Sequence, residues 1–420
     1  MKKKLLIFAL ITAFVSIPFS FTSSTVNAEK NDLSGEKMIE IRKKNNLEYS
    51  RETINLLLKE EIDSVHEKFY GIPLLPEEEA RIVKRNELQT LAEELSQSLA
   101  KVSGFAGLEV QEDKIVVRMA SDFNVVADAR LTAAKNDLVI EKVMYSIEEL
   151  ENIHKKLDQE IDGAMMFVDQ VKNKLTVYTP NKESVAQYLT EEELKKVDII
   201  ESEIKVEDQA YGIGRHIVNY ATSRPCSVGI YGYASNGDSV AVTAGHCVNS
   251  GTTPAFYKID SNGNISTKIG NFVKGTTNNT NADAGYIKLD NASDISTSIG
   301  STPITQASGS HLTNTSVGTL SQNTLWSTNG TIVSSSASVP NGSGTLTDAV
   351  LTNNTNTVGG DSGSIVFTSF FNSVKNRYEY KIYGIHKGIA TTGDGKQYQI
   401  YSKISNVKTA LNLSGFALGN

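Results

Sequence analysis

The sequence predicts two structurally different regions, an α+β region at residues 29–206 and an all-β barrel or sandwich at residues 207–420. The first region is rich in Glu, Lys and Leu, with apolar residues at helical spacing. In the second region Ser, Thr, Asn and Gly dominate and charged residues are sparse. Short β-branched runs recur there between turn signals, which is typical of many short strands in a barrel or sandwich.

Residues 1–28 precede both regions and are predicted to be a secretory signal peptide. Lysines at 2–4 form a positive end, residues 5–15 an apolar core, and Val26-Asn27-Ala28 a cleavage site. A membrane anchor is the alternative, but the apolar run is shorter than the roughly 20 residues that span a bilayer. We therefore expect a secreted bacterial protein with no stable membrane anchor.

The α+β region shows helical periodicity from Glu36 to Ala100. After it, strand-like and helix-like segments alternate. We expect strands or hairpins at 108–119 and 165–178, and helices at 147–161 and 184–196.

The second region contains short β-branched runs at 240–243, 286–289 and 380–383, and one predicted helix at 404–413. Asn-Gly pairs are the strongest short signal of a tight turn between strands. Four such pairs are predicted turns: Asn236-Gly237, Asn262-Gly263, Asn329-Gly330 and Asn341-Gly342.

Charge is unevenly divided along the chain, whose formal net charge is −7. Residues 206–420 hold 13 Lys and Arg against 11 Asp and Glu, whereas residues 1–205 hold 28 against 37. No basic patch with interleaved aromatic residues occurs, which excludes nucleic acid as an expected partner.

The chain has two cysteines, Cys226 and Cys247. An even pair in an exported protein predicts one disulfide. A metal site is the alternative, but two cysteines without clustered histidines make a poor metal site. We expect neither a metal nor another cofactor.

The segment Gly360-Asp361-Ser362-Gly363-Ser364 has the sequence that surrounds the nucleophilic serine of trypsin-like peptidases. A serine hydroxyl is a weak nucleophile and needs a neighbouring base. It also needs amide N–H groups aimed at the oxyanion that forms on the attacked carbonyl. Flanking glycines allow the tight turn that presents such amides.

His246 is the candidate base, because it directly follows a predicted strand and precedes Cys247, whose disulfide would hold it on a rigid support. Asp283, just before the next predicted strand, is the candidate acid that orients the imidazole. Asp290 and Asp294 compete for that role but follow the strand as turn residues. The order His, Asp, Ser matches chymotrypsin and excludes the subtilisin and α/β-hydrolase orders.

Four segments carry a resemblance to the bacterial chymotrypsin-fold peptidases of the α-lytic protease and streptogrisin type: 226–229, 242–247, 283–286 and 360–363. The resemblance covers roughly residues 210–415. It implies two six-stranded β-barrels with the active site between them. It also implies that His246 is the general base, Asp283 its orienting acid and Ser362 the nucleophile, with the amides of Gly360 and Ser362 as the oxyanion hole.

The substrate pocket departs from that group, because Ser364 replaces a usual glycine and the usual second disulfide has no cysteines here. Residues 351–359 contain no Asp or Glu, which disfavours cleavage after Lys or Arg. Thr357 and the run His386-Lys387-Gly388 resemble the glutamyl endopeptidases of staphylococci and bacilli. There the matching Thr and His bind an acidic side chain, and both groups can donate hydrogen bonds to a carboxylate. A pocket for small apolar residues, as in elastase, is the alternative.

Residues 165–179 resemble the strand-turn-strand unit of the propeptides in the α-lytic protease group, which implies a removable segment that assists folding and inhibits the enzyme. A permanent binding domain is the alternative. Residues 212–217 resemble the start of a mature enzyme, so the cut is expected between Glu201 and Gly212. Glutamate occurs 27 times before residue 206 and twice after it, which suits self-cleavage after Glu201, Glu203 or Glu207.

The expected partners are therefore protein or peptide substrates and the chain's own propeptide. A catalytically inactive chymotrypsin-fold binding protein is the alternative from another functional class.

Overall fold

The computed structural model describes residues 35–44, 47–59, 74–111, 113–121, 135–208, 216–219, 221, 224–248, 253–259, 264–277, 280–299, 302–320, 328–342, 344–353, 357 and 360–420. The predicted signal peptide and the predicted turn at Asn262-Gly263 lie outside these residues. Within the described residues, no helix combines the length and the apolar character needed to cross a membrane.

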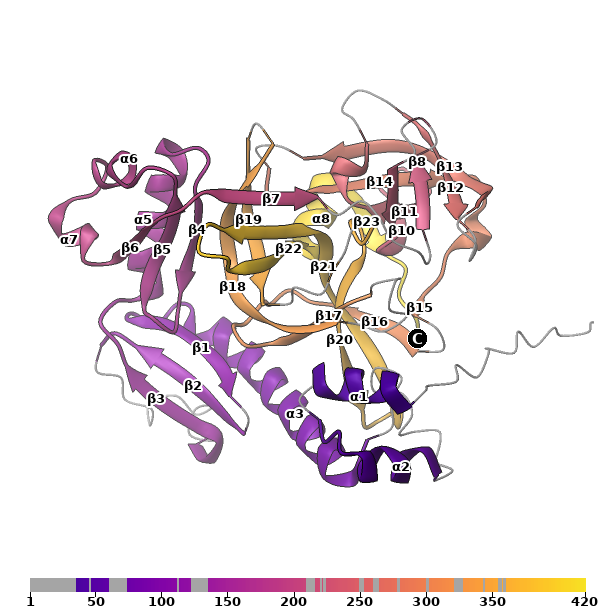
Figure 1. The fold of residues 1–420 in the computed structure, drawn as a ribbon, viewed down its shortest axis with the longest axis horizontal. Coiled ribbons are helices and arrows are strands. Elements are labelled where there is room, and N and C mark those ends of the chain that lie inside the picture. Colours follow the sequence, from indigo (N-terminus) through magenta and orange to yellow (C-terminus); the bar gives the residue numbers. More distant parts are fainter. Residues whose placement is uncertain are drawn as a thin grey trace, which may run out of the picture.

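In the described residues up to 100, the N-terminal part forms three helices, as the periodicity predicted (Figure 1). Helices α1 (Gly35–Lys44) and α2 (Arg51–Lys59) pack on each other through Met38, Ile54 and Leu57. The longer α3 (Pro76–Leu99) packs its apolar stripe on a three-stranded sheet. The strands of that sheet are β1 (Phe105–Gln111), β2 (Lys114–Met119) and β3 (Leu138–Lys142).

A second α+β unit follows, in which α5 (Ile147–Glu160) packs on β4 (Met165–Asp169) and β5 (Lys174–Thr179). Strand β6 (Val197–Glu201) then pairs in parallel with β5. The single helix predicted at 184–196 is wrong, because two short helices occupy the segment, α6 (Lys182–Ala186) and α7 (Glu191–Leu194). The hydroxyl of Thr190 accepts a hydrogen bond from the Glu193 amide and starts a new helix there.

The first barrel is a closed ring of six strands, if β9 and its direct continuation β10 count as one bent strand. Around the ring, β8 pairs with β9, β10 with β11, and then β14, β13 and β12 lead back to β8. The predicted turn at Asn236-Gly237 joins β10 to β11, with Gly237 at φ 86°. The strands are β8 (His216–Asn219), β9 (Arg224–Ser227), β10 (Ile230–Ala234), β11 (Ser239–Thr243), β12 (Ala255–Ile259), β13 (Ile265–Thr276) and β14 (Ala284–Leu289).

The second barrel is also a closed ring of six strands, in the order β17, β18, β19, β22, β21, β20 and back to β17. The all-β double six-stranded barrel expected from the sequence is thus confirmed. The strands are β17 (Ser316–Thr319), β18 (Thr328–Asn341), β19 (Gly344–Thr352), β20 (Ile365–Asn372), β21 (Arg377–Thr392) and β22 (Gln397–Lys403), with β15 (Ser298–Ile299) and β16 (Thr302–Ala307) outside the ring.

One predicted turn of this barrel is confirmed and another is wrong. Asn341-Gly342 joins β18 to β19, whereas Asn329-Gly330 lies inside β18 and pairs with Gly318 and Val317 of β17. An Asn-Gly pair forms a hairpin turn only where the segments before and after it pair with each other. Here both segments belong to the one strand β18, which pairs with β17, β19 and β4.

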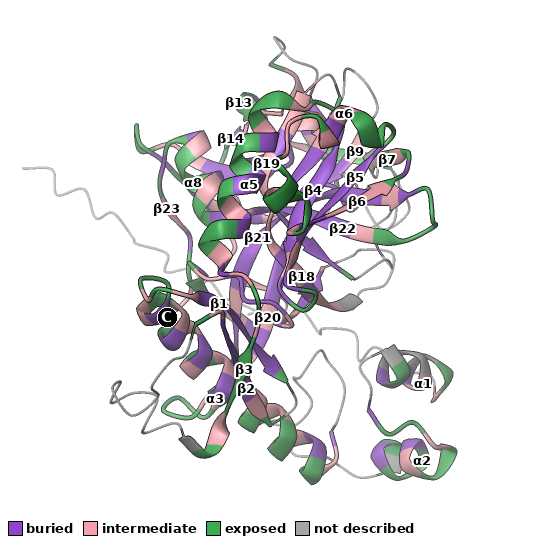
Figure 2. Cartoon of the chain, turned by 90° about the vertical axis from the view of Figure 1, so that its left-hand side faces the viewer, coloured by how far each residue is buried: buried purple, intermediate pink, exposed green. Residues whose placement is uncertain are grey.

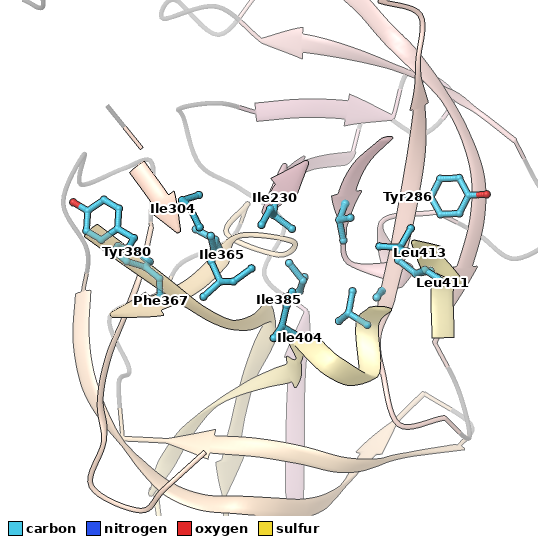
Figure 3. Packing of buried hydrophobic residues seen from close by; sticks show 14 of the residues in the cluster. Ile230, Tyr286, Ile304, Ile365, Phe367, Tyr380, Ile385, Ile404, Leu411 and Leu413 are labelled. Atoms are coloured by element: carbon cyan, nitrogen blue, oxygen red, sulfur yellow. The ribbon is translucent and has the colours of Figure 1, made fainter. Parts of the chain in front are cut away.

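A shared core lies between the two barrels (Figure 3). It joins Ile230 of β10 to Ile365 of β20 and Ile385 of β21, and the predicted C-terminal helix α8 (Ile404–Leu411) adds Ile404. The chain then ends in β23 (Leu413–Phe416), which pairs with β10 of the first barrel. The rims of the two barrels are therefore held at a fixed position relative to each other.

The N-terminal part joins the second barrel by strand pairing at two places. Strand β4 pairs with β18, with Phe167 opposite Ala337, and β7 (Ile204–Asp208) pairs with β21, from Ile204 opposite Thr392 to Asp208 opposite Gly388. Figure 1 shows β7 crossing from the N-terminal part to the barrel, and Figure 2 shows buried residues along β4, β18 and β21. One sheet of twelve strands thus spans both predicted regions.

Candidate functional site

His246 lies on a single helical turn, η4 (Gly245–Cys247), at the rim of the first barrel directly after β11. Cys247 forms the predicted disulfide with Cys226 of β9, which ties this turn to the barrel wall. Gly245 is needed beside it, because a Cβ there would lie 2.1 Å from the Thr276 carbonyl oxygen. The histidine backbone is thus held on both sides, and its side chain keeps 15% of its surface exposed.

Asp283 is fully buried at the start of β14 and faces this turn. Its Oδ1 accepts the His246 backbone N–H at 2.9 Å, and its Oδ2 lies 2.6 Å from His246 Nδ1. The competing Asp290 and Asp294 pair with Lys268 and Lys258 instead. Of the three carboxylates weighed from the sequence, only Asp283 contacts the imidazole.

Several groups act on the carboxylate of Asp283. Burial raises its pKa, but the charge and hydrogen bonds of His246, with the charge of Lys387, hold that pKa below its usual value. The carboxylate is therefore ionised at neutral pH, as an acceptor for the imidazole N–H must be.

Ser362 lies in the tight turn before β20, on the second barrel. Its Oγ is 2.9 Å from His246 Nε2 and also 2.9 Å from the carbonyl oxygen of Lys387. Gly363 has φ +89°, and a Cβ at that position would lie 2.3 Å from Thr243 Oγ1. The glycine thus lets the turn approach β11 of the first barrel and brings Ser362 to His246.

Two backbone amides of this turn form hydrogen bonds within the protein, and two others are the expected oxyanion hole. Those of Gly363 and Ser364 donate to the carbonyls of His386 and Asp361. The amides of Gly360 and Ser362 are the pair expected to bind an oxyanion, and Gly360 adopts φ +99°. The Gly360 carbonyl is held by the Ser227 hydroxyl at 2.8 Å, which fixes the orientation of the turn.

His386 of the predicted pocket is fully buried on β21, and Thr357 is 3% exposed. Burial, with the positive charges of His246 and Lys387, lowers the pKa of His386 to about 3. The imidazole of His386 is therefore neutral at neutral pH and can donate one N–H.

Lys387 and Gly388 continue the same strand with different contacts. The Lys387 amino group lies 3.8 Å from Asp283 Oδ2, so this side chain faces the buried Asp283 carboxylate. Gly388 lies opposite Asp208 of β7. The predicted pocket edge is thus paired with the chain's own N-terminal part.

A buried polar group behind His386 was missed from the sequence. Gln399 of β22 places its Nε2 3.0 Å from His386 Nδ1 and donates to Thr319 Oγ1 at 2.5 Å. The Gln399 carbonyl oxygen accepts from Thr352 Oγ1 at 2.8 Å. No sequence signal marks these three residues, because Thr319 and Thr352 lie 80 and 47 positions from Gln399 on other strands and meet it only when the barrel closes.

Comparison with known proteins yields likeness in structure alone. No protein-family model matches the sequence, and no curated protein is detectably similar to it. The solved structures to which the chain is similar are bacterial serine proteases.

A glutamic acid-specific serine protease, described as using a histidine triad in substrate binding, is 22% identical over 47% of this chain and 96% of its own, with a TM-score of 0.36. An α-lytic protease homolog, N4, is 18% identical over 48% of this chain and 96% of its own, with a TM-score of 0.36. The Nocardiopsis protease is 18% identical over 49% of this chain and 97% of its own, with a TM-score of 0.34. At these identities and TM-scores, the likeness gives this chain neither an activity nor a specificity.

Proposed function

We propose that the chain is the proprotein of a secreted serine endopeptidase that acts through His246, Asp283 and Ser362. The observation that carries the proposal is the continuous hydrogen-bonded line from the Asp283 carboxylate through both nitrogens of His246 to Ser362 Oγ. A structural histidine has no need of a serine hydroxyl on one nitrogen and a buried carboxylate on the other.

In the proposed reaction, His246 Nε2 removes the Ser362 proton as Oγ attacks the carbonyl carbon of the scissile peptide bond. The amides of Gly360 and Ser362 stabilise the oxyanion that results. The imidazolium, held by Asp283, then gives the proton to the departing amine and leaves an ester on Ser362. Water attacks that ester with His246 again as base, which releases the acid product and restores the hydroxyl.

A fluorophosphonate probe tests this proposal directly, since it labels only an activated serine. The secreted wild-type protein should be labelled and should cleave a protein substrate, whereas Ser362→Ala should lose both, with turnover falling by roughly 10⁶-fold. Ser364→Ala is the matched control two residues away, and it should still be labelled. Equal labelling of the wild type and Ser362→Ala, or none of either, would favour the inactive binding protein instead.

We further propose that the enzyme prefers glutamate at the cleaved position. Thr357 and His386 supply a hydroxyl and a neutral imidazole as donors for a carboxylate, and residues 351–359 contain no acidic side chain. The structurally similar glutamic acid-specific protease is described as binding substrate through a histidine triad. In this chain, a described neighbour of His386 Nδ1 is an amide, Gln399 Nε2, at 3.0 Å.

Profiling on a peptide library decides between this preference and an elastase-like one. Peptides with Glu at the cleaved position should lead, and His386→Ala should reduce their kcat/KM by about 100-fold while sparing peptides with Ala there. An unchanged profile in His386→Ala would contradict the acidic pocket and leave the peptidase proposal intact.

The proposed propeptide is residues 29–206, which would assist folding and inhibit until removed. Three observations support it: β7 covers the edge of β21 as an extended antiparallel strand, a mode by which peptides bind sheets; Ser362 is fully buried in the uncut chain; and the net charges of the two regions are opposite. A barrel built from distant strand pairs also folds slowly enough to benefit from a template.

The pairing register of β7 with β21 indicates where the propeptide is cleaved. Glu207 lies opposite Ile389, two residues along β21 from Lys387, whereas Glu201 ends β6 before β7 begins. We therefore favour a cut at Glu207 or within a few residues after it over Glu201 and Glu203. N-terminal sequencing of the secreted form should find a new terminus at 208–212; a terminus before Ile204 would contradict this placement.

A further inference from the structure

Lys387 is a buried cation beside the catalytic acid. Its Nζ lies 3.8 Å from Asp283 Oδ2, and the two side chains are 1% and 0% exposed. A lysine is seldom fully buried unless it is paired. The paired carboxylate in this case is the one that orients His246.

The backbone at Lys387 explains how its side chain reaches Asp283. The pairing of β21 with β22 shifts register between His386 and Gly388, so Lys387 is the extra residue of a bulge. Bulges re-aim side chains and leave a residue out of the ladder. The carbonyl oxygen of Lys387 thereby lies 2.9 Å from Ser362 Oγ, while its amino group turns to Asp283.

A charge imbalance would exist without the lysine. Asp283 faces two groups of His246, the backbone N–H at Oδ1 and the ring Nδ1 at Oδ2. An isolated buried carboxylate is costly. His386, the other titratable group that faces this site from β21, is neutral above pH 3 or so and supplies no charge. The strongest charges acting on Asp283 are those of His246, once protonated, and Lys387.

On the basis of the proposed function, we propose that Lys387 is a positioning residue whose ammonium balances the charge of Asp283 and so sets how readily His246 takes up a proton. The pair Lys387–Asp283 is neutral overall, so a proton arriving on His246 meets less net negative charge than Asp283 alone would present. Activity should therefore persist to lower pH than it would with an uncharged residue at 387.

The first test is the pH dependence of kcat/KM for the secreted enzyme. Lys387→Met should move the midpoint of the acidic limb upward by about one pH unit, and Lys387→Arg should keep it near the wild-type position. Lys396→Met removes the same charge from the exposed β21–β22 turn and should leave the midpoint unchanged. Asp361, a second fully buried carboxylate next to the nucleophile, is kept in every variant. An unmoved midpoint in Lys387→Met would overturn the proposal.

The second test does not depend on activity and uses the uncut chain in the Ser362→Ala background. Asp283→Asn removes the negative charge 3.8 Å from the buried Lys387 Nζ, so adding Lys387→Met to Asp283→Asn should raise the folding equilibrium constant by at least about tenfold. If the double variant is no more stable, or fails to fold where Asp283→Asn alone folds, the charge-pair proposal is wrong. Because this measurement needs no catalysis, its result stands even if the wild type is not a peptidase.

Discussion

The two barrels have the same number of strands but are stabilised in different ways. The first barrel is tied internally, with the Cys226–Cys247 disulfide next to His246 and Asp283 at the end of a neighbouring strand. The second barrel carries Ser362 and continues through β18 and β21 into a sheet that includes the N-terminal part. His246 and Asp283 therefore lie on the barrel with the disulfide, although Asp283 also contacts Lys387 and Ser402 of the second barrel. Ser362 lies on the barrel that pairs with the N-terminal part.

This difference suggests that the first barrel holds a fixed geometry and that the second barrel depends on the N-terminal part. Groups that must keep one geometry lie where a covalent bond and short local pairings fix them. Ser362 and the predicted pocket lie on the barrel with which β4 and β7 pair. Each prediction below tests one side of this comparison, and all stability measurements use the uncut chain in the Ser362→Ala background.

The largest effect is expected at the acid of the first barrel. Asp283→Asn keeps the shape of the side chain but favours the wrong tautomer of His246, so kcat should fall by about 10⁴-fold. Asp290→Asn, an exposed position in the same barrel that pairs with Lys268, should change kcat less than twofold. Assays on a chromogenic peptide would show this, and similar losses in both variants would remove Asp283 from its proposed role.

The next effect is expected at the junction between the N-terminal part and the second barrel. Phe167 is 2% exposed and packs its ring against Tyr178 and Tyr398, so Phe167→Ala should lower the free energy of unfolding by about 3–5 kcal/mol. Val171→Ala, in the exposed β4–β5 turn, should stay within about 0.5 kcal/mol of the parent chain. Denaturant titration measures both, and a stable Phe167→Ala chain would mean that the second barrel does not rely on this junction.

A smaller loss is expected from the covalent tie of the first barrel. The disulfide closes a loop of about 21 residues, so replacing Cys226 and Cys247 together by Ala should cost about 3 kcal/mol. The parent chain unfolded under reducing conditions should match the double variant. An unchanged denaturation midpoint in the variant would show that the barrel pairings alone hold the first barrel closed.

The smallest effect is expected in how the free energy of unfolding depends on pH. Burial, with the charge of Lys403, lowers the pKa of His311 to about 3 in the folded chain, against about 6.5 when unfolded. Between these values only the unfolded chain binds the proton, so stability is lost as pH falls, by about 1 kcal/mol between pH 7 and 5.5. His311→Gln should remove that share of the pH dependence. Identical slopes of stability against pH in the two chains would contradict the assignment.

Local signals predicted the long helices and some of the strands. Helical spacing predicted α3 and α5, Asn-Gly pairs predicted two of the tight turns, and the β-branched runs predicted β11 and β14. The prediction failed at 184–196, where a capping residue divides the helix, and at Asn329-Gly330, where the strand partner lies elsewhere in the chain. In both cases the local residue pattern matched the predicted element, but the groups that the backbone hydrogen-bonds to could not be read from neighbouring residues.

The sequence by itself determined which groups are available: a serine in a glycine-rich turn, a histidine beside a cysteine, an aspartate before a strand and one possible disulfide. These depend on residue type and on neighbours a few positions away. Only the tertiary structure decided that Lys387 faces Asp283, that Gln399 supports His386 and that β7 covers β21. The physical reason is that barrel closure and a one-residue bulge bring together strands far apart in the chain, and side-chain alternation alone does not tell which face meets which.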